Sequence, residues 1–232
     1  MVVKVNNRSL HKEIGYTNKF PKWACAYKFP ALEKVTTVKS IINQVGKTGV
    51  ITPVAIIDPV DLGGAMVERV TLHNFDNIKT KDIRINDQVV IIRSGDVIPK
   101  IIQVFTDRRT GREEVIKVPT ICPCCNSPLE QENVYLKCTN NTCTDKVVAF
   151  ITDFAAKDNL NIVGLSEGIV RTLVDNELIF NPADLYLLKY EELIKLPGFK
   201  DKKVTNLLTA IEKSKHPTMD RFIHSLGISN VG

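Results

Sequence analysis

The sequence predicts a multidomain α+β protein in which a small β-barrel, a compact cysteine cluster and an all-α region follow one another. Three observations predict this order: short runs rich in Val, Ile and Thr, then two pairs of cysteines, then a helical apolar period from Asp145 onward. We therefore place domain boundaries in four segments. Residues 1–31 form a basic and aromatic segment, and residues 32–118 form the predicted barrel. Residues 119–144 contain the cysteine cluster, and residues 145–232 contain the predicted helices.

The first segment, residues 1–31, accounts for the whole net positive charge of the chain, because the remaining residues sum to zero. It holds six Lys and Arg against one acidic residue, whereas the whole chain has a net charge of +5. Prolines and the lack of a helical period predict strands and loops. About thirty residues cannot bury a core alone, so the segment belongs to something larger. Cys25 is expected to be a small core residue, and the pattern around Lys4 and Lys28 fits either outward-facing strand residues or phosphate-binding cations.

The second segment reads as β structure. Strand-like runs lie near 35–45, 50–57, 66–72, 88–93 and 97–105, with Gly, Pro and Asn between them. Five short strands in this span predict a small closed or half-closed barrel. An OB-type barrel is the first choice and an SH3-like barrel the second. Basic residues lie beside glycines in its loops, where they can bind a nucleic-acid backbone. Ordinary solvated turns account for these residues equally well.

The cysteine segment predicts a structural zinc finger. Cys122 and Cys125 form one close pair, and Cys138 and Cys143 form a second. Four thiolates at this spacing can surround one Zn²⁺ tetrahedrally and leave no position for a catalytic water. The alternative is a set of buried or disulfide-bonded cysteines. Cys124 offers another sulfur, but we expect Cys125 to be the ligand because adjacent residues do not easily point at one metal.

The last segment shows apolar stripes of short helices. They are expected at Val147/Ile151/Phe154, Ile169/Leu173/Val174, Val204/Leu207/Leu208/Ile211 and Met219/Phe222/Ile223/Leu226. Gly198, after Leu196-Pro197, precedes a helix start rich in lysine, with Lys200 and Lys202. Gly164 precedes another helix in a similar turn. Such turns hold a DNA phosphate on backbone N–H groups in helix-hairpin-helix modules, and the plainer alternative is a glycine that only ends a helix.

Composition and charge narrow the class of protein. Apolar residues make up 44% and charged residues 25% of the chain, which is ordinary for globular domains. Apolar runs stay far below the ~18–20 residues that span a bilayer, and the start lacks a secretory h-region. We therefore expect a cytoplasmic protein without membrane contact. The stretch 195–215 is positive, with six basic and two acidic residues, so DNA binding by this region is expected to be salt-sensitive.

Several motifs, in order, resemble the second half of a bacterial-type NAD-dependent DNA ligase. Residues 2–6 resemble the end of the nucleotidyltransferase motif Asp-Gly-Val-Val-x-Lys. Residues 15–31 resemble the last motif of that domain. Four stretches resemble the ligase OB fold: Val45-Gly46-Lys47-Thr48-Gly49, Thr52-Pro53-Val54-Ala55, Thr71-Leu72-His73-Asn74 and Arg93-Ser94-Gly95-Asp96-Val97-Ile98-Pro99. The four cysteines and the hairpin helices follow as that family has them.

The resemblance implies an activity and a set of site residues. In that family an adenylation domain reacts with NAD, carries AMP on a lysine and passes it to the 5′-phosphate of a nick, which the 3′-hydroxyl then joins, with Mg²⁺ assisting. Lys4 and Lys28 would contact the adenylate phosphate. The OB surface would meet the nick, and the helical hairpins would hold flanking duplex. The residues implied for DNA contact are Lys47, Thr48, Arg93, Val97, Ile98, Gly164, Gly198, Lys200 and Lys202.

The departures from the family pattern shape the remaining expectations. The nucleophile motif Lys-x-Asp-Gly does not occur in this sequence, so we expect the chain alone not to self-adenylate. The last hairpin is expected to be truncated at Gly232. Lys47 occupies a position where the family usually has an arginine. A lysine cannot bind a phosphate through two parallel hydrogen bonds as an arginine can. Lys200 and Ser166 replace glycines of the hairpin pattern.

The sequence therefore supports two hypotheses for the function, which belong to different classes. The chain is either the DNA-clamping part of a ligase, working with a separate N-terminal portion, or a non-enzymatic DNA-binding protein or truncated paralogue built from the same modules. An RNA- or ribosome-associated protein is a third and weaker reading. In each of the first two, the expected partner is duplex DNA, nicked for the ligase, and the expected state is a monomer associated with the nucleoid.

Overall fold

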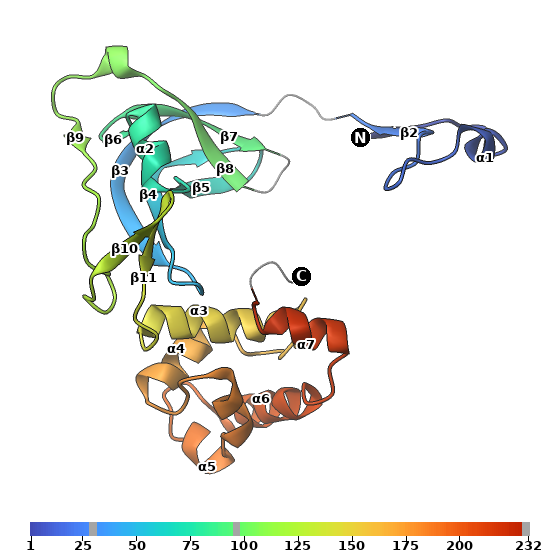
Figure 1. Ribbon diagram of the computed structural model, residues 1–232, viewed down its shortest axis with the longest axis vertical. Coiled ribbons are helices and arrows are strands. Elements are labelled where there is room, and N and C mark those ends of the chain that lie inside the picture. The colour runs from blue at the N-terminus through green and yellow to red at the C-terminus, as the bar shows by residue number, and fades with distance from the viewer. Residues whose placement is uncertain (28–31, 95–97, 229–232) are drawn as a thin grey trace. The chain divides into compact units, whose positions relative to one another are not determined.

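The structure is a computed structural model that describes residues 1–27, 32–94 and 98–228 (Figure 1). The chain falls into two compact units. The first contains residues 1–40, 56–70 and 84–114, and the second contains residues 41–55, 71–83 and 115–232. Each is described by itself. The domain boundaries expected from the sequence remain predictions.

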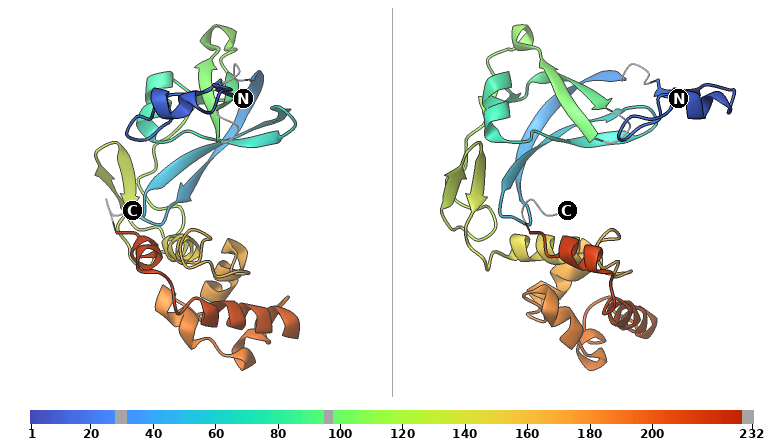
Figure 2. Two further views of the ribbon diagram at one scale, coloured as in Figure 1. Left: turned by 90° about the vertical axis from the view of Figure 1, so that its right-hand side faces the viewer. Right: turned by 45° about the vertical axis from the view of Figure 1, so that its right-hand side comes forward.

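A curled five-stranded sheet provides the β architecture (Figure 2). Its strand order is β5-β4-β3-β7-β8. The strands are β3 (Glu33–Val45), β4 (Ile51–Asp61), β5 (Met66–Thr71), β7 (Gln88–Ser94) and β8 (Ile98–Val104). β7 runs antiparallel to both β3 and β8, with Val35 opposite Val90, and its register with β8 shifts between Val90 and Ile91. The five predicted strands are confirmed within the described residues.

Buried aliphatic side chains explain why these segments form a sheet. Val38, Ala55, Val89 and Ile91 are fully buried. The neighbours of Val38 in β3 are more exposed, which is the period-2 pattern of a strand with one face on a core. In β4 and β7, by contrast, consecutive residues are buried, such as Val54 with Ala55 and Val89 with Val90. Shorter elements join the strands and were not predicted. These are α2 (Phe75–Lys81), η1 (Thr106–Arg108) and the pair β6 (Arg84–Ile85) with β9 (Glu114–Val115).

The first residues of the chain form a small hairpin-like unit. β1 (Val2–Lys4) pairs antiparallel with β2 (Ala24–Ala26), and α1 (Leu10–Ile14) lies between them in the chain. The indole of Trp23 stacks on His11 at 3.9 Å between ring centroids. Strands and loops are as expected, whereas the short α1 was missed. Cys25 is exposed, so its prediction as a core residue is wrong.

The helical part confirms a helix at each of the four apolar stripes, although the side chains of the fourth stripe, Met219, Phe222, Ile223 and Leu226, are exposed. The four helices are α3 (Thr144–Phe154), α4 (Glu167–Asp175), α6 (Asp201–Lys213) and α7 (Met219–Ser225). The short η2 (Pro182–Leu187) and α5 (Tyr190–Leu193) were not predicted. One core joins α3, α4, η2, α5 and α6. Its fully buried members include Ile151, Leu173, Leu185, Leu193 and Val204. In the described part of the chain, no helix has the length and apolar character needed to cross a membrane.

Candidate metal site and nucleic-acid interface

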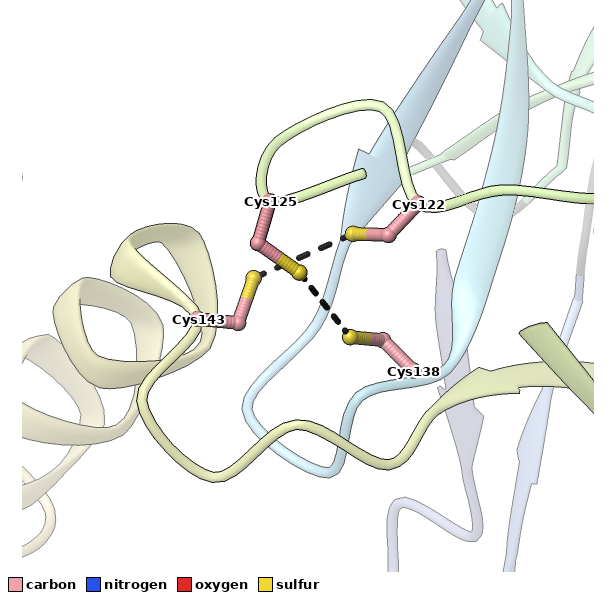
Figure 3. Close-up of side chains that lie close together, drawn as sticks. All are labelled: Cys122, Cys125, Cys138 and Cys143. Carbon is pink, nitrogen blue, oxygen red and sulfur yellow. Dashed lines mark hydrogen bonds between the residues drawn. The ribbon is translucent and has the colours of Figure 1, made fainter. Parts of the chain in front are cut away.

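The four predicted cysteine ligands converge on one point (Figure 3). Cys122 and Cys125 lie on a loop that ends at the hairpin of β10 (Leu129–Glu132) and β11 (Tyr135–Cys138). Cys138 closes β11, and Cys143 is the N-cap of α3. Their sulfur atoms all lie within 4.8 Å of one another, with 3.5 Å between those of Cys125 and Cys138. Four sulfurs at these separations suit a tetrahedral metal centre.

The environment of these thiols differs from one residue to the next. Hydrogen bonding from the Ser127 hydroxyl and backbone lowers the pKa of Cys125 to about 6. Burial raises the pKa of Cys138 to about 11, and burial also raises the pKa of Cys143. Three of the four residues are buried. The four cysteines together form a group that could hold a metal ion.

Cys124 lies outside this tetrad. Its sulfur accepts a hydrogen bond from the backbone N–H of Asp145 at 3.4 Å. The sulfur therefore contacts the first turn of α3 and is not among the four that converge. This placement agrees with the sequence argument that Cys125 is the better ligand of the two neighbours.

The turn between β3 and β4 packs directly on the cysteine cluster. The carbonyl of Gly49 accepts the backbone N–H of Cys138 at 2.8 Å, and Val50 forms a β-bridge with Lys137. Gly49 has φ +83°, and a Cβ atom on it would clash with the carbonyl oxygen of Cys138. A side chain is thus excluded here both by backbone conformation and by space. We call residues 46–49 the OB turn.

The OB turn carries two of the predicted DNA contacts. Thr48 is exposed at its tip. Lys47 is half-buried, and its ammonium donates to the carboxylate of Asp153 on α3, 2.7 Å from Oδ2. Sequence reasoning did not anticipate this partner, because Asp153 lies 106 residues away along the chain.

The two predicted hairpin glycines open onto one cavity. Gly164, before α4, and Gly198, before α6, have φ values of +92° and +75° and open space where a Cβ would be. Both line a cavity of about 440 Å³ together with Lys200 and Lys202. These lysines are exposed, whereas the ammonium of Lys203 lies 4.0 Å from the centroid of the Phe199 ring. The structure therefore brings four predicted DNA-binding residues together.

The remaining predicted residues lie elsewhere. Lys4 is exposed on β1, opposite Ala24. Ile98 is 50% exposed at the start of β8 and lies opposite Ser94 of β7, and the neighbouring β7 residue Arg93 pairs with Pro99. Lys28 and Val97 lie outside the described residues, as does the side chain of Arg93.

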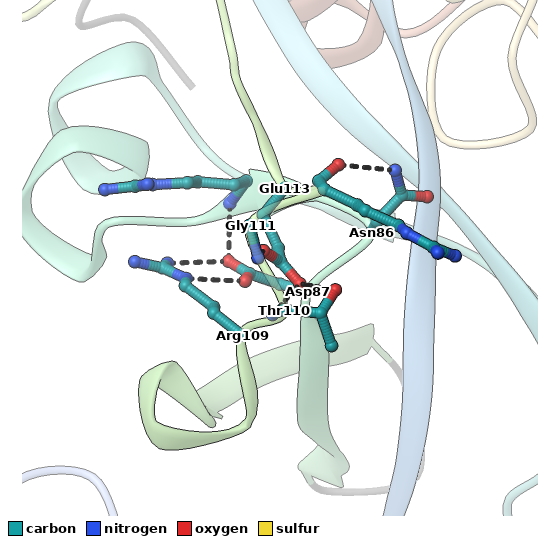
Figure 4. A network of polar contacts seen from close by, with 8 residues as sticks. Asn86, Asp87, Arg109, Thr110, Gly111 and Glu113 are labelled. Atoms are coloured by element: carbon teal, nitrogen blue, oxygen red, sulfur yellow. Dashed lines mark hydrogen bonds and ion pairs between the residues drawn. The ribbon is translucent and has the colours of Figure 1, made fainter.

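A polar network in the first unit was missed by sequence reasoning (Figure 4). The side chain of Asp87 is fully buried and receives two hydrogen bonds of 2.8 Å from the guanidinium of Arg109. It also accepts the backbone N–H of Arg84 at 2.7 Å. Nearby, the Glu113 carboxylate accepts the backbone N–H groups of Thr110 and Gly111, and the first of these bonds lowers its pKa. In the sequence, Asn86-Asp87 indicates only a turn, so no sequence pattern predicted that Asp87 forms a buried ion pair with Arg109.

Comparison with known proteins finds similar sequences along the whole chain, and all of those described below are DNA ligases. The chain is 54% identical over all 232 residues to a DNA ligase of Sulfurovum sp. (strain NBC37-1), of which it covers 36%. It is 50% identical over the same length to DNA ligases of Aliarcobacter butzleri (strain RM4018) and Helicobacter pylori (strain J99 / ATCC 700824). It covers 36% and 35% of these two. The chain is therefore homologous throughout to DNA ligases and spans about a third of their length.

Family models identify the group within that class. Residues 35–113 match the NAD-dependent DNA ligase OB-fold domain, and residues 1–32 match the NAD-dependent DNA ligase adenylation domain. The resemblance to NAD-dependent DNA ligases, a family of enzymes, is thereby confirmed. The same match confirms the OB-type choice over the SH3-like one for the curled sheet.

Proposed function

We propose that this chain is the DNA-holding part of an NAD-dependent DNA ligase. Such an enzyme seals a nick in duplex DNA by joining the 5′-phosphate to the 3′-hydroxyl through enzyme-AMP and DNA-adenylate. The observation that carries the proposal is the cavity shared by Gly164, Gly198, Lys200 and Lys202. Two turns from different helix pairs meet there beside the exposed cations Lys200 and Lys202, and the homology to DNA ligases indicates that their ligand is DNA.

The chemistry of this cavity suits the DNA backbone. At a glycine with positive φ and open space beside it, a phosphate can approach the main chain closely. The N-terminus of α6, a helix of 13 residues, follows Gly198 and adds the N–H groups of its first turn and a positive dipole end. Lys200 and Lys202 add charge at the same place. These contacts position a duplex without reading its sequence, which a nick-sealing enzyme requires. We therefore assign a helix-hairpin-helix role to residues 145–232.

The other predicted contacts take roles that the family gives them. Lys4 and Lys28 would contact the adenylate phosphate, and Lys47, Thr48, Arg93, Val97 and Ile98 would meet the nick on the OB surface. NAD supplies the adenylate and Mg²⁺ balances phosphate charge in the complete enzyme. Because the sequence contains no Lys-x-Asp-Gly, no adenylate mass shift is expected when this chain alone is incubated with NAD and Mg²⁺.

We further propose that Cys122, Cys125, Cys138 and Cys143 hold one structural Zn²⁺. Thiolate sulfur is a preferred ligand of zinc, and four such ligands complete its tetrahedral shell. When bound, the ion neutralises the thiolates and ties the loop, β11 and α3 together. Since burial raises the pKa of Cys138 and Cys143, these two thiols must lose protons on binding, and affinity falls as the pH falls.

Calorimetry tests the zinc assignment. Titration of Zn²⁺ at pH 7 into the chelator-treated chain, in buffers of different ionisation enthalpy, is expected to show release of about two or more protons per ion, because two of the thiols have raised pKa values. The Cys124→Ser variant is the matched control and is expected to bind with the same stoichiometry. Binding without proton release, or loss of binding in the control, would contradict the ligand set.

Binding to a nicked duplex tests the DNA-holding role. The Lys200→Ala/Lys202→Ala variant is expected to bind more weakly, and the slope of log affinity against log salt is expected to fall by about 0.9 for each phosphate that the chain no longer neutralises. Lys146→Ala on α3, whose ammonium donates to Asn141, is the control and is expected to match the parent chain. Equal binding by all three proteins would overturn the assignment of the cavity.

Complementation separates a ligase part from a non-enzymatic DNA-binding protein. The chain is mixed with a separately expressed N-terminal portion of a homologous ligase and assayed on nicked DNA with NAD and Mg²⁺. Sealing that depends on this chain supports the ligase, whereas tight DNA binding without any sealing favours the second function. Light scattering in the same buffer checks the expected monomer.

A further inference from the structure

The ion pair between Lys47 and Asp153 places an acid directly on a proposed DNA contact. The ammonium of Lys47 lies 2.7 Å from the carboxylate, and the two side chains are 38% and 32% exposed. A phosphate can therefore reach the pair from solvent. An ion pair that is this open to water contributes about 0–1 kcal/mol. Its weakness means that a better anion can replace Asp153 at small cost.

The carboxylate is the fixed member of the pair. Asp153 lies on α3, where its carbonyl accepts the side-chain amide of Asn159 at 2.5 Å and its Oδ2 lies 3.4 Å from the same nitrogen. Asn159 is 2% exposed and is itself hydrogen-bonded to His224 of α7. Lys47, by contrast, carries its ammonium on a flexible four-carbon stem. The pair consequently opens by movement of the lysine side chain.

The backbone of the OB turn does not depend on this ion pair. Gly49 and Val50 hold it against the cysteine cluster through the Cys138 and Lys137 backbones. Breaking the pair therefore frees a cation while the turn stays in place. Lys47 can change partner without refolding of the surrounding structure.

We propose that Asp153 occupies Lys47 in the DNA-free protein and that a backbone phosphate of the nicked duplex displaces it. This inference rests on the proposed role of Lys47 as a phosphate contact. The carboxylate competes with phosphate for the same ammonium. Asp153 thus lowers the affinity for DNA phosphates modestly and favours DNA that is also held elsewhere on the chain. Asp153 is a specificity-determining residue that acts through Lys47.

A double-mutant cycle on the full chain tests the competition. Affinity for a nicked duplex is measured for the parent chain, Asp153→Asn, Lys47→Ala and the double variant. Asp153→Asn is expected to raise affinity about two- to fivefold, the equilibrium equivalent of an exposed ion pair. Lys47→Ala is expected to lower affinity. Adding Asp153→Asn to Lys47→Ala is expected to change nothing further, because the lysine that the acid competes for is gone.

The controls separate this competition from general charge removal and from misfolding. Asp145→Asn, on the same helix, removes an acid that also sits in an ion pair, 2.9 Å from Arg171, and is expected to leave affinity unchanged. Thermal unfolding verifies that each variant is folded. An equal gain from Asp153→Asn with and without Lys47, or a loss of affinity, would overturn the competition.

Two further outcomes distinguish the inference from the proposed function. If Lys47→Ala binds like the parent while Lys200→Ala/Lys202→Ala is impaired, the competition is wrong and the DNA-holding role stands. If none of these proteins, including the parent, binds nicked DNA, the proposed function itself is wrong.

Discussion

Two ion pairs, one in each compact unit, show how burial decides what a charge pair does. Asp87 is fully buried and meets Arg109 through two hydrogen bonds of 2.8 Å, whereas Asp153 is 32% exposed and meets Lys47 through one. A carboxylate without solvent depends strongly on its cationic partner, because loss of that partner leaves an uncompensated charge in a low dielectric. A carboxylate that water reaches can exchange its partner. The first pair is therefore structural and the second is suited to competition with a ligand.

The difference also follows the residue types. The arginine fork matches both oxygens of Asp87 and fixes the geometry, and the segment that follows η1 is thereby tied to the start of β7. Lysine provides a point charge on a mobile stem. The OB turn thus has a backbone that is held firmly and a cation that is held loosely.

The largest expected effect comes from breaking the buried pair. Asp87→Ala leaves the Arg109 guanidinium without this carboxylate and is expected to lower the free energy of unfolding by about 3–5 kcal/mol. Urea unfolding, with hydrogen exchange of β7 amides, measures the loss in the first unit. Arg108→Ala is the control, because this exposed side chain stacks on Phe105 and bonds Gln88, and it is expected to cost less than about 1 kcal/mol. A loss below that value for Asp87→Ala would contradict the structural role.

The next largest effect is expected from a substitution in the backbone of the OB turn. Gly49→Ala introduces a Cβ that clashes with the Cys138 carbonyl oxygen at a φ of +83°. Gly64→Ala has a similar φ of +85° with nothing within 4 Å, and it is expected to cost about 1–2 kcal/mol from backbone strain alone. Gly49→Ala is expected to cost more and also to weaken Zn²⁺ binding, which competition with a chromophoric chelator measures. Equal costs and unchanged metal affinity would show that the turn does not press on the cluster.

The smallest expected effect is on the exposed pair. Asp153→Asn is expected to lower the free energy of unfolding by less than about 1 kcal/mol, and the difference from the parent should shrink further at high salt. Urea unfolding at low and high ionic strength provides the measurement. A loss comparable to that of Asp87→Ala would mean that the two pairs are alike and that Lys47 is not free to change partner.

Local patterns in the sequence predicted most of the elements and the metal cluster. Runs rich in Val, Ile and Thr between turn residues mark the strands, as around Val38 and Val89. The i, i+3, i+4, i+7 spacing from Val204 to Ile211 marks α6, and cysteine spacing identified the tetrad. Short elements such as α2 and α5 span too few turns to show a period. These depend on caps and tertiary contacts, such as the Asn74 side chain that accepts the Asn77 N–H at 2.8 Å.

Pairings across long separations were beyond sequence reasoning. Arg109 lies 22 residues from Asp87, and Asp153 lies 106 residues from Lys47. Neither carboxylate carries a local mark of its burial or its partner, since both look like ordinary surface acids. The cavity that joins Gly164 to Gly198 was foreseen only as two separate turns. Their meeting depends on how α4 and α6 pack on the common core.

The contact between Gly49 and Cys138 imposes an order on folding as the chain is synthesised. The OB turn leaves the ribosome about ninety residues before the β11 strand that receives it. Until then, the Gly49 carbonyl lacks the Cys138 N–H, whereas the Gly46 N–H and the Val50 carbonyl already bond to each other within the turn. The contact can therefore form only after β11 has been synthesised, and because it joins residues far apart in the chain, it is expected to form slowly compared with the β10–β11 hairpin.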